Sequence, residues 1–215
     1  MKIGVIMGGI SSEREISLKS GEQVIKNLNK DKYEKIIPII INSQKEVIEK
    51  VKEIDFAFIA LHGRFGEDGT IQGTLETMGI PYSGCGVLCS AISMNKCLTK
   101  RLVKSIGIET ASWITVKSLE DINYKKIQEI GYPVFIKPNN GGSSVATFLI
   151  RNESEIENAV KEALKYDKEV MIEKYIDGEE ITSFILNGEV FPTVVIKANM
   201  GEFFDYKSKY EENGA

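Results

Sequence analysis

The chain has 215 residues, of which 27 are Lys or Arg and 31 are Asp or Glu, so its formal charge is −4. Hydrophobic residues make up 42% of the sequence, and there are 19 glycines and 5 prolines. This composition excludes a collagen-like chain, a disordered tail and a disulfide-stapled miniprotein. The acidic balance and the absence of a basic block argue against a dedicated nucleic-acid-binding protein.

Targeting and metal signals are also missing from the sequence. No apolar run approaches the roughly 20 residues that a membrane-spanning helix needs, and the N-terminus lacks the apolar region of a signal peptide. We therefore expect a cytoplasmic protein with no membrane association. Cys85, Cys89 and Cys97 lack C-x-x-C spacing, and the single histidine is distant in sequence. We therefore expect these cysteines to be structural thiols and not to form a metal site.

The first 61 residues alternate between strand-like and helix-like segments. Expected strands cover 2–7, 36–41 and 55–61, and expected helices cover 12–28, which opens with a Ser12-x-x-Glu15 capping box, and 44–53. This β-α-β-α-β order predicts a parallel sheet with helices on its faces. Ligands of such sheets bind beyond the carboxyl ends of the strands. The loops 8–12 and 62–70 are expected at those ends.

From residue 94 onward the pattern restarts as a second, α+β unit. Expected helices cover 94–105, 119–130 and 153–165, and expected strands cover 113–116, 133–137, 145–150 and 169–175. Asn187-Gly188 lies between two alternating runs within 181–196, which predicts a β-hairpin.

Two loops of the first unit carry polar groups. The first, Gly8-Gly9-Ile10-Ser11-Ser12-Glu13, follows a strand, but Ile10 and Glu13 occupy positions where a dinucleotide-binding fingerprint needs glycine. A carboxylate there would repel a pyrophosphate and suits a cation such as a substrate ammonium; alternatively, the acids only favour a helix start. The second loop begins at His62 and contains three glycines. His62 is a ligand contact or a hydrogen-bonded structural residue.

Three segments of the second unit suggest a nucleotide. Lys137 ends an apolar strand and precedes a Gly/Ser-rich loop over 139–144, a pattern that suits phosphate oxygens or, alternatively, an exposed turn. No GxxxxGK[ST] motif occurs, so the chain is not a P-loop NTPase. The acidic residues and Tyr175 within 173–180 are suited to binding an adenine and a ribose. Alternatively, this segment is an acidic turn exposed to water. Residues 207–210 are another phosphate contact or a basic turn.

Taken in order, these segments resemble one family. The sequence contains Gly-Gly-x-Ser-x-Glu-Arg-Glu-x-Ser, His-Gly-Arg-x-Gly-Glu-Asp-Gly, Ser-Met-Asn-Lys, Lys-Pro-x-x-x-Gly-Ser-Ser, Ile-Glu-Lys-Tyr and Asp-Tyr-x-x-Lys-Tyr, between residues 3 and 210. It closely resembles the D-alanine–D-alanine ligases of the ATP-grasp superfamily. The resemblance implies an N-terminal α/β parallel-sheet (pre-ATP-grasp) domain over 1–93. A central ATP-grasp subdomain over 94–179 and the start of a C-terminal subdomain over 180–215 would form an incomplete ATP-grasp fold.

The resemblance also implies an activity and site residues. The family joins two D-alanines with ATP through an acyl phosphate, for peptidoglycan precursors. Glu13 would bind the first D-alanine's ammonium and form a catalytic hydrogen-bonded group with Ser143 and Tyr210, which also helps to position the second D-alanine. His62 would lie near the first D-alanine's carboxylate. The residues implied as ATP contacts are Lys96, Lys137, Ser144, Glu173, Lys174, Ile176, Glu180 and Lys209.

Three departures from the family pattern stand out. Ala146 replaces a usual glycine, Gly141 replaces an acid of some members, and the sequence stops at Ala215, before the family's ligands for Mg²⁺ or Mn²⁺. A protein of these 215 residues alone is therefore expected to be inactive. A homodimer is implied by resemblance only. The alternatives are a D-Ala–D-Ser or D-Ala–D-lactate ligase and a non-catalytic nucleotide-binding module.

Overall fold

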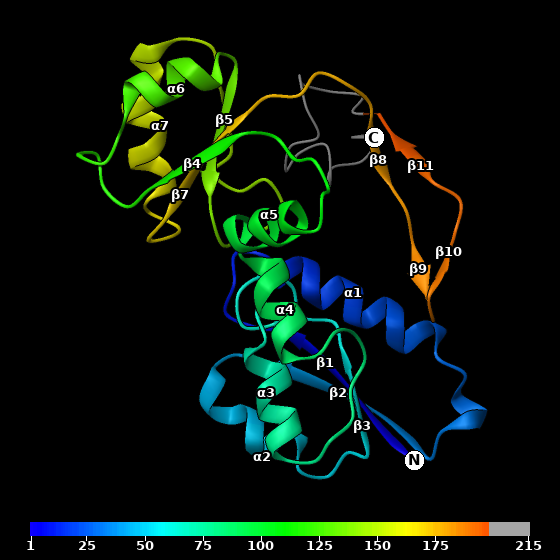
Figure 1. Cartoon of the computed structure of the whole chain (residues 1–215). Helices are drawn as coiled ribbons and strands as arrows, with labels where there is room; N and C mark the ends of the chain where they lie inside the picture. Colours follow the sequence, from blue (N-terminus) through cyan, green and yellow to red (C-terminus); the bar gives the residue numbers. More distant parts are fainter. Residues whose placement is uncertain (198–215) are drawn as a thin grey trace. The chain divides into compact units, whose positions relative to one another are not determined.

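The computed structural model describes residues 1–197, and the chain divides into two compact units, residues 1–102 and 103–215. The two units are coloured along the sequence in Figure 1. Each unit is built from its own sheet and helices. Among residues 1–197, every helix is too short or too polar to cross a membrane.

The first unit is a parallel sheet with helices on both faces. Its strand order is β2-β1-β3, and both strand pairs are parallel, as the sequence predicts. The strands and helices of this unit are β1 (Lys2–Gly8), α1 (Arg14–Asn27), β2 (Lys35–Ile41), α2 (Val47–Val51), β3 (Phe56–Ile59), α3 (Thr70–Thr77), α4 (Val87–Met94) and α5 (Lys96–Ser105), with 3₁₀ turns at Lys30–Lys32 and Gln44–Glu46. The helix α5 runs across the boundary between the two units.

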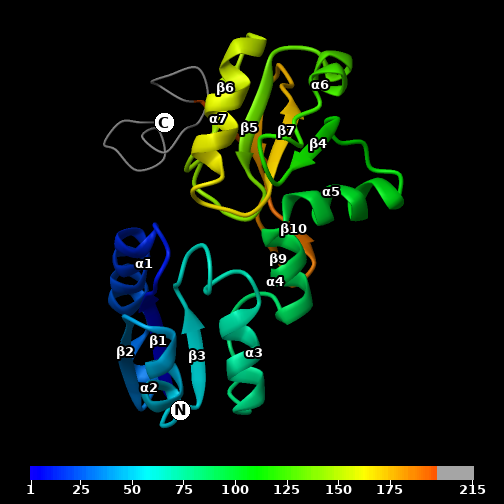
Figure 2. The same cartoon turned by 90° about the vertical axis from the view of Figure 1, so that its left-hand side faces the viewer.

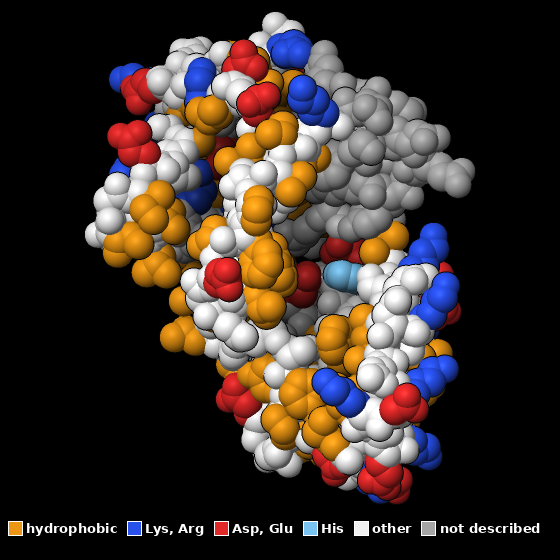
Figure 3. All heavy atoms as spheres, turned by 90° about the vertical axis from the view of Figure 1, so that its right-hand side faces the viewer, with side chains coloured by type: hydrophobic (Ala, Val, Ile, Leu, Met, Phe, Trp, Pro, Cys, Tyr) orange, Lys and Arg blue, Asp and Glu red, His pale blue; other side chains and the backbone are white. Residues whose placement is uncertain are grey.

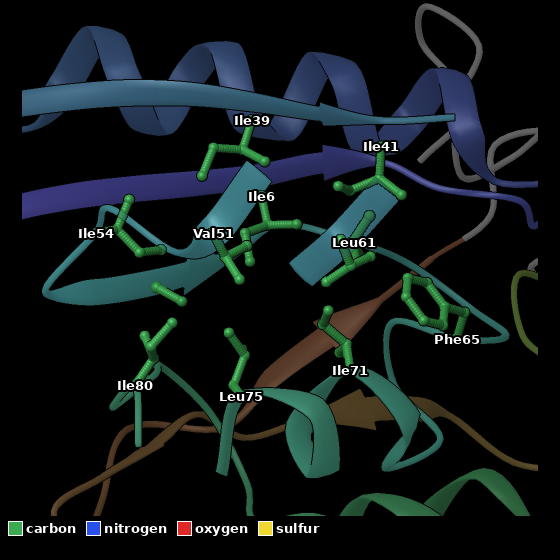
Figure 4. Close-up of a cluster of buried hydrophobic side chains, with 12 residues drawn as sticks. Ile6, Ile39, Ile41, Val51, Ile54, Leu61, Phe65, Ile71, Leu75 and Ile80 are labelled. Carbon is green, nitrogen blue, oxygen red and sulfur yellow. The ribbon is translucent and has the colours of Figure 1, made fainter. Parts of the chain in front are cut away.

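Alternate residues of β1 face opposite layers of the first unit. Val5 and Met7 pack toward α1, whereas Ile6 belongs to the cluster formed with α2 and α3. Figure 4 shows Ile71 and Leu75 pointing from α3 toward the side chains that descend from the sheet. This period of two is that of a strand buried on both faces, and it fixes the register that sets where the strand ends lie.

The second unit is an antiparallel sheet covered by helices. Its strand order is β4-β7-β5-β6. The helices α6 and α7 lie against this sheet (Figure 2), and their apolar side chains share one buried cluster with it. The elements are β4 (Trp113–Val116), α6 (Tyr124–Ile130), β5 (Val134–Pro138), β6 (Phe148–Ile150), a 3₁₀ turn at Glu153–Glu155, α7 (Ile156–Ala163) and β7 (Val170–Lys174).

Two short antiparallel pairs follow this sheet. They are formed by β8 (Glu180–Thr182) with β11 (Val194–Ile196), and by β9 (Ile185–Leu186) with β10 (Glu189–Val190). Asn187 and Gly188 have φ values of 52° and 83° and join β9 to β10. Two consecutive positive φ values are typical of a type I′ hairpin turn, so the predicted hairpin is confirmed.

Three sequence predictions about element ends are wrong for local reasons. The capping box at Ser12 does not form: α1 has Glu13 as its N-cap, with no side-chain cap hydrogen bond. The helix predicted from 119 begins at Tyr124, because Asp121 Oδ2 accepts from the N–H groups of Lys117 and Ser118 and closes a turn first. The strand predicted from 145 begins at Phe148, because the N–H groups of Val145 and Thr147 donate to the Gly142 and Ser144 carbonyls and hold the chain in turns up to that point.

Two helices of the first unit were missed. The sequence prediction treats 62–70 as a loop and places no helix at α3, and it starts a helix at residue 94 where α4 ends. Gly69, with φ of 89°, turns the chain directly into α3. Asn95 is extended between α4 and α5, so the expected single helix is two.

Candidate functional site

The loop after β1 is fixed by α1 side chains. Ser17 Oγ accepts from the Gly8 N–H at 2.9 Å and donates to the Ala60 carbonyl at 2.7 Å. Arg14 Nη1 donates to the Gly9 and Ile41 carbonyls at 3.0 and 2.7 Å. The carboxyl ends of all three strands are thus tied together through one helix.

Ser11 joins this loop to the loop that follows β3. Its Oγ donates to the His62 carbonyl at 2.7 Å and accepts from the Glu13 N–H at 3.2 Å. Two segments 51 residues apart in sequence therefore meet at one hydroxyl. This contact places the two loops singled out in the sequence side by side, as the parallel sheet predicts.

His62 is held between two side chains. Ser20 Oγ lies 2.9 Å from Nε2, and Glu67 Oε1 lies 3.7 Å from Nδ1. With a neutral ring we assign the proton to Nδ1, facing Glu67, so that Nε2 accepts from Ser20. The side chain of His62 is 32% exposed and is the single pale blue side chain in Figure 3.

The charges around His62 favour its protonated form. Interaction with the Glu67 carboxylate raises the pKa of His62 above its ordinary value of 6.5, and the charge of Glu13 acts in the same direction. Burial acts against them. The ring of His62 is therefore protonated over a wider pH range than an ordinary histidine.

Glu13 closes the same cluster. It is 6% exposed, and a Cβ added to Gly63 would lie 2.5 Å from Glu13 Oε2. Gly63 also donates its N–H to Glu67 Oε2 at 2.7 Å. The glycine, with φ of 68°, allows both carboxylates to approach the backbone of this loop.

Two members of the cluster were missed by sequence reasoning. Neither Ser20 nor Glu67 is assigned a role of its own from the sequence. Ser17 and Ser20 lie one helical turn apart, so they share the face of α1 that meets the strand ends. That spacing is the signal that could have pointed to Ser20.

In the second unit, Lys137 and Glu173 form an ion pair. They come from the adjacent strands β5 and β7, where Glu173 is registered opposite Phe135. Their side chains are 21% and 13% exposed. Because the pair is so enclosed, each charge depends on its partner in this structure.

Neighbouring groups complete this end of the sheet. Lys174 Nζ donates to the Gly131 carbonyl at 3.0 Å. The rings of Phe135 and Tyr175 have centroids 5.6 Å apart, and Lys137 Nζ lies 5.8 Å from the Phe135 centroid. The described contacts therefore gather one lysine, one carboxylate and two aromatic rings along β5 and the end of β7, whereas Lys174, the residue after that carboxylate in β7, faces the opposite side of the sheet.

The loop between β5 and β6 has an unusual backbone. Ser143, Ser144 and Ala146 have φ values of 51°, 57° and 51°. Such left-handed conformations cost a residue with a Cβ roughly 1–2 kcal/mol each. The strain falls on the Ser-Ser pair singled out as a phosphate contact and on the alanine that departs from the family pattern.

The other candidate residues are placed by the elements that carry them, or lie outside the described residues. Lys96 is the first residue of α5, Glu180 is exposed at the start of β8, and Ile176 is 65% exposed. Lys209 and Tyr210 lie outside the described residues. Glu13 belongs to the first unit and Ser143 to the second, and each is described within its own unit.

Residues 1–197 contain no cluster of three or more His, Cys, Asp or Glu side chains that could hold a metal ion. The described residues therefore do not fit a Mg²⁺ site of protein ligands. Any phosphate charge bound at these residues would be met by lysines and hydrogen-bond donors.

Comparison with known proteins places both units in one family. A family model described as D-ala D-ala ligase N-terminus matches residues 2–50 and 43–85, and one described as D-ala D-ala ligase C-terminus matches residues 102–215. D-alanine–D-alanine ligase B of Clostridium perfringens is 59% identical over 215 residues, which are 100% of this chain and 70% of that protein.

Solved structures agree with this assignment. The D-alanine–D-alanine ligase of Bacillus anthracis superposes with a TM-score of 0.87 at 48% identity, covering 100% of this chain and 70% of that one. A D-alanine–D-alanine ligase of Bacillus anthracis complexed with ATP gives a TM-score of 0.84 at 46% identity, covering 91% of this chain and 66% of that one.

The first unit has a parallel sheet, the second has an antiparallel sheet covered by helices, and the chain superposes on a solved ligase. Together these features define an enzyme of the ATP-grasp class, which confirms the predicted fold class. More narrowly, the chain belongs to the D-alanine–D-alanine ligase family. It spans about 70% of the length of the curated relative it matches.

Proposed function

We propose that this protein joins two D-alanine molecules into D-alanyl-D-alanine at the expense of ATP, for peptidoglycan precursors. The carboxylate of the first D-alanine attacks the γ-phosphate of ATP, and ADP leaves. The amine of the second D-alanine attacks the resulting acyl phosphate, and phosphate leaves. The observation that carries the proposal is the 59% identity of all 215 residues to a protein named D-alanine–D-alanine ligase B.

The first unit would bind the first D-alanine at Glu13 and His62. Glu13 has little water contact, and a carboxylate in such a place favours a cation such as an ammonium. His62, whose pKa is raised by Glu67, would carry the positive charge that a substrate carboxylate needs. The pair is thus matched in sign to the two ends of an amino acid.

The second unit would bind ATP around Lys137. Lys137 would turn from Glu173 to a phosphate oxygen, which leaves the Glu173 carboxylate to accept from the adenine amine. Ser143 and Ser144 would supply hydroxyl groups, with Ser143 also joining Glu13 and Tyr210. The remaining proposed ATP contacts are Lys96, Lys174, Ile176, Glu180 and Lys209.

The proposal extends to the setting of the reaction. Mg²⁺ or Mn²⁺ is expected to accompany ATP, and we assign no ligand to it because residues 1–197 hold no cluster that fits. A cytoplasmic location follows from the use of ATP. A homodimer is proposed by family resemblance.

The ATP site is tested by comparing two lysines of the second unit. Lys137→Met should raise the Kd for ATP about tenfold or more, because it removes the enclosed cation. A tenfold change in Kd corresponds to about 1.4 kcal/mol of binding free energy. Lys161→Met, on the exposed face of α7, should leave affinity unchanged. Calorimetry on both variants measures this. Equal affinities would remove Lys137 from the proposed site.

The acceptor is tested by comparing D-alanine, D-serine and D-lactate. The protein as isolated from its host should release phosphate and form a dipeptide most efficiently with D-alanine as second substrate. Higher kcat/KM with D-serine or D-lactate would assign the alternative ligases. ATP binding without turnover in any mixture would assign the non-catalytic module.

A further inference from the structure

The hydroxyl of Ser20 in α1 bonds a ring that lies 42 residues away in the sequence. A serine or threonine within a helix can bond the carbonyl one turn earlier. Thr77 does so in α3, where its hydroxyl donates to the Gly73 carbonyl at 2.7 Å. Ser20 Oγ lies instead 2.9 Å from His62 Nε2, in a half-buried contact. Ser20 therefore joins α1 to the loop after β3.

The backbone around His62 is anchored by other groups. Ser11 Oγ donates to the His62 carbonyl at 2.7 Å, and the N–H of the next residue, Gly63, donates to Glu67 Oε2 at 2.7 Å. With the backbone held, the direction of the ring depends on what its two nitrogens meet. Among the described residues, Ser20 meets Nε2 and Glu67 meets Nδ1.

The two neighbours of the ring differ in the hydrogen bonds they form. An ionised carboxylate only accepts, whereas a hydroxyl both donates and accepts. Nδ1 therefore keeps its proton toward Glu67. The Ser20 hydroxyl donates to Nε2 of a neutral ring, and after rotating it accepts from Nε2–H of a protonated ring. One ring direction thus serves both charge states of His62.

The Nδ1 edge of the ring is the one with room for a further acceptor. Glu67 Oε1 lies 3.7 Å from Nδ1, which is longer than the limit of about 3.2 Å for a well-formed N–H···O hydrogen bond. Nε2 is already engaged at 2.9 Å by Ser20. The carboxylate of Glu13, proposed to bind the substrate ammonium, lies beside the next residue, Gly63. An amino acid held by Glu13 would find the available donor of the His62 ring at Nδ1.

We propose that Ser20 is a positioning residue for the first D-alanine. By holding Nε2, it fixes the tautomer and the direction of the His62 ring, so that Nδ1–H faces the substrate carboxylate. The inference rests on the proposed binding of that carboxylate by His62, and it adds a residue that acts on the substrate through the ring. Without the Ser20 hydroxyl, Nε2 loses its donor, and a neutral ring can then carry its proton on Nε2 as well.

The tautomer of the ring is read without any substrate. The 215-residue sequence has one histidine, so ¹⁵N NMR in mildly alkaline solution, where the ring is neutral, shows which nitrogen carries the proton. The wild type should carry it on Nδ1, and Ser20→Ala should carry part of it on Nε2. Ser20→Thr keeps the hydroxyl and should restore the wild-type spectrum. Thr77→Ala removes an exposed hydroxyl from α3 and should leave the spectrum unchanged.

Steady-state kinetics tests whether the ring acts on the substrate. In the protein produced by its host, Ser20→Ala should lower kcat/KM for D-alanine about fivefold or more, because one hydrogen bond that orients the ring is lost. The KM for ATP should stay within about twofold of the wild-type value, since the ATP contacts are proposed in other residues. Ser20→Thr should recover most of the loss, and circular dichroism checks that each variant is folded.

Two results would overturn the positioning role of Ser20. One is an unchanged tautomer in Ser20→Ala, and the other is an equal loss of kcat/KM for D-alanine and for ATP. A wild type that forms no D-alanyl-D-alanine would instead contradict the proposed function, and the ring signals would still decide whether Ser20 sets the tautomer of His62.

Discussion

His62 depends on a carboxylate from its own loop and a hydroxyl from α1. Glu67→Gln removes the main interaction that raises the pKa of His62, so the pKa should fall toward or below 6.5. Because the sequence has one histidine, its ring gives a single set of NMR signals whose titration reports this value. Glu49→Gln, on the exposed α2 surface, is the control and should leave the titration unchanged.

The same interaction links folding to pH. A pKa raised in the folded state contributes stability that is complete below the unfolded value and is lost as pH rises through the folded value. The wild type should therefore lose this contribution above about pH 6.5, and Glu67→Gln should lose less. Identical pH slopes of the unfolding free energy for both proteins would contradict the assigned contact.

Ala146 adopts a backbone conformation that suits glycine. Its φ of 51° costs roughly 1–2 kcal/mol for a residue with a Cβ, and the extra freedom of an unfolded glycine offsets roughly 0.5–1 kcal/mol of that. Ala146→Gly should stabilise the protein by up to about 1 kcal/mol in urea unfolding. Ala159→Gly, in the buried face of α7, should instead destabilise it by about 1 kcal/mol or more. The idea fails if both substitutions destabilise equally.

At the scale of elements, close packing of α1 on β1 requires a glycine. A Cβ at Gly21 would lie 2.4 Å from Met7 Sδ and 2.7 Å from Met7 Cβ, and Met7 is 3% exposed. Gly21→Ala should therefore destabilise the protein by about 1–3 kcal/mol through overpacking, as measured by urea unfolding.

A second helical glycine provides the matched control. The nearest atom to a Cβ at Gly73 in α3 is Val87 Cγ2 at 3.8 Å, an ordinary contact. Gly73→Ala should be neutral or should stabilise by up to about 1 kcal/mol, since alanine has the higher helix propensity. If Gly21→Ala is equally tolerated, α1 is free to shift away from the sheet.

The elements show what periodicity can and cannot predict. The strands of the first unit and the Asn187-Gly188 hairpin follow from apolar runs and turn residues, and both were predicted. The helix α3 was missed because Gly63, Gly66 and Gly69 make its approach look like one long loop, and only the packing of Ile71 and Leu75 reveals the helix.

The residues of the candidate site likewise include some that the sequence predicts and some that only the structure reveals. Charged residues at strand ends, such as Glu13, His62 and Lys137, can be selected from the sequence because a parallel sheet or an apolar strand delivers them there. Their partners cannot be selected so easily. Ser20 meets His62 across 42 residues and Glu173 meets Lys137 across 36, and both contacts depend on the completed fold.

At the scale of the whole molecule, the two units hold chemically distinct sets of groups. The first has a carboxylate and a histidine suited to an amino acid, and the second has lysines, aromatic rings and a Gly/Ser loop suited to a nucleotide. The two family models match residues in both units, so the proposed function rests on both sets of groups together. The central claim is that both serve a single ligation.

Simultaneous measurement of phosphate and dipeptide tests this claim most directly. The protein purified from its host is given ATP, Mg²⁺ and D-alanine, and both products are followed in time. We predict equal amounts of phosphate and D-alanyl-D-alanine, with no release of either when D-alanine is omitted. Phosphate release that does not need D-alanine, or that proceeds without the dipeptide, would contradict the account.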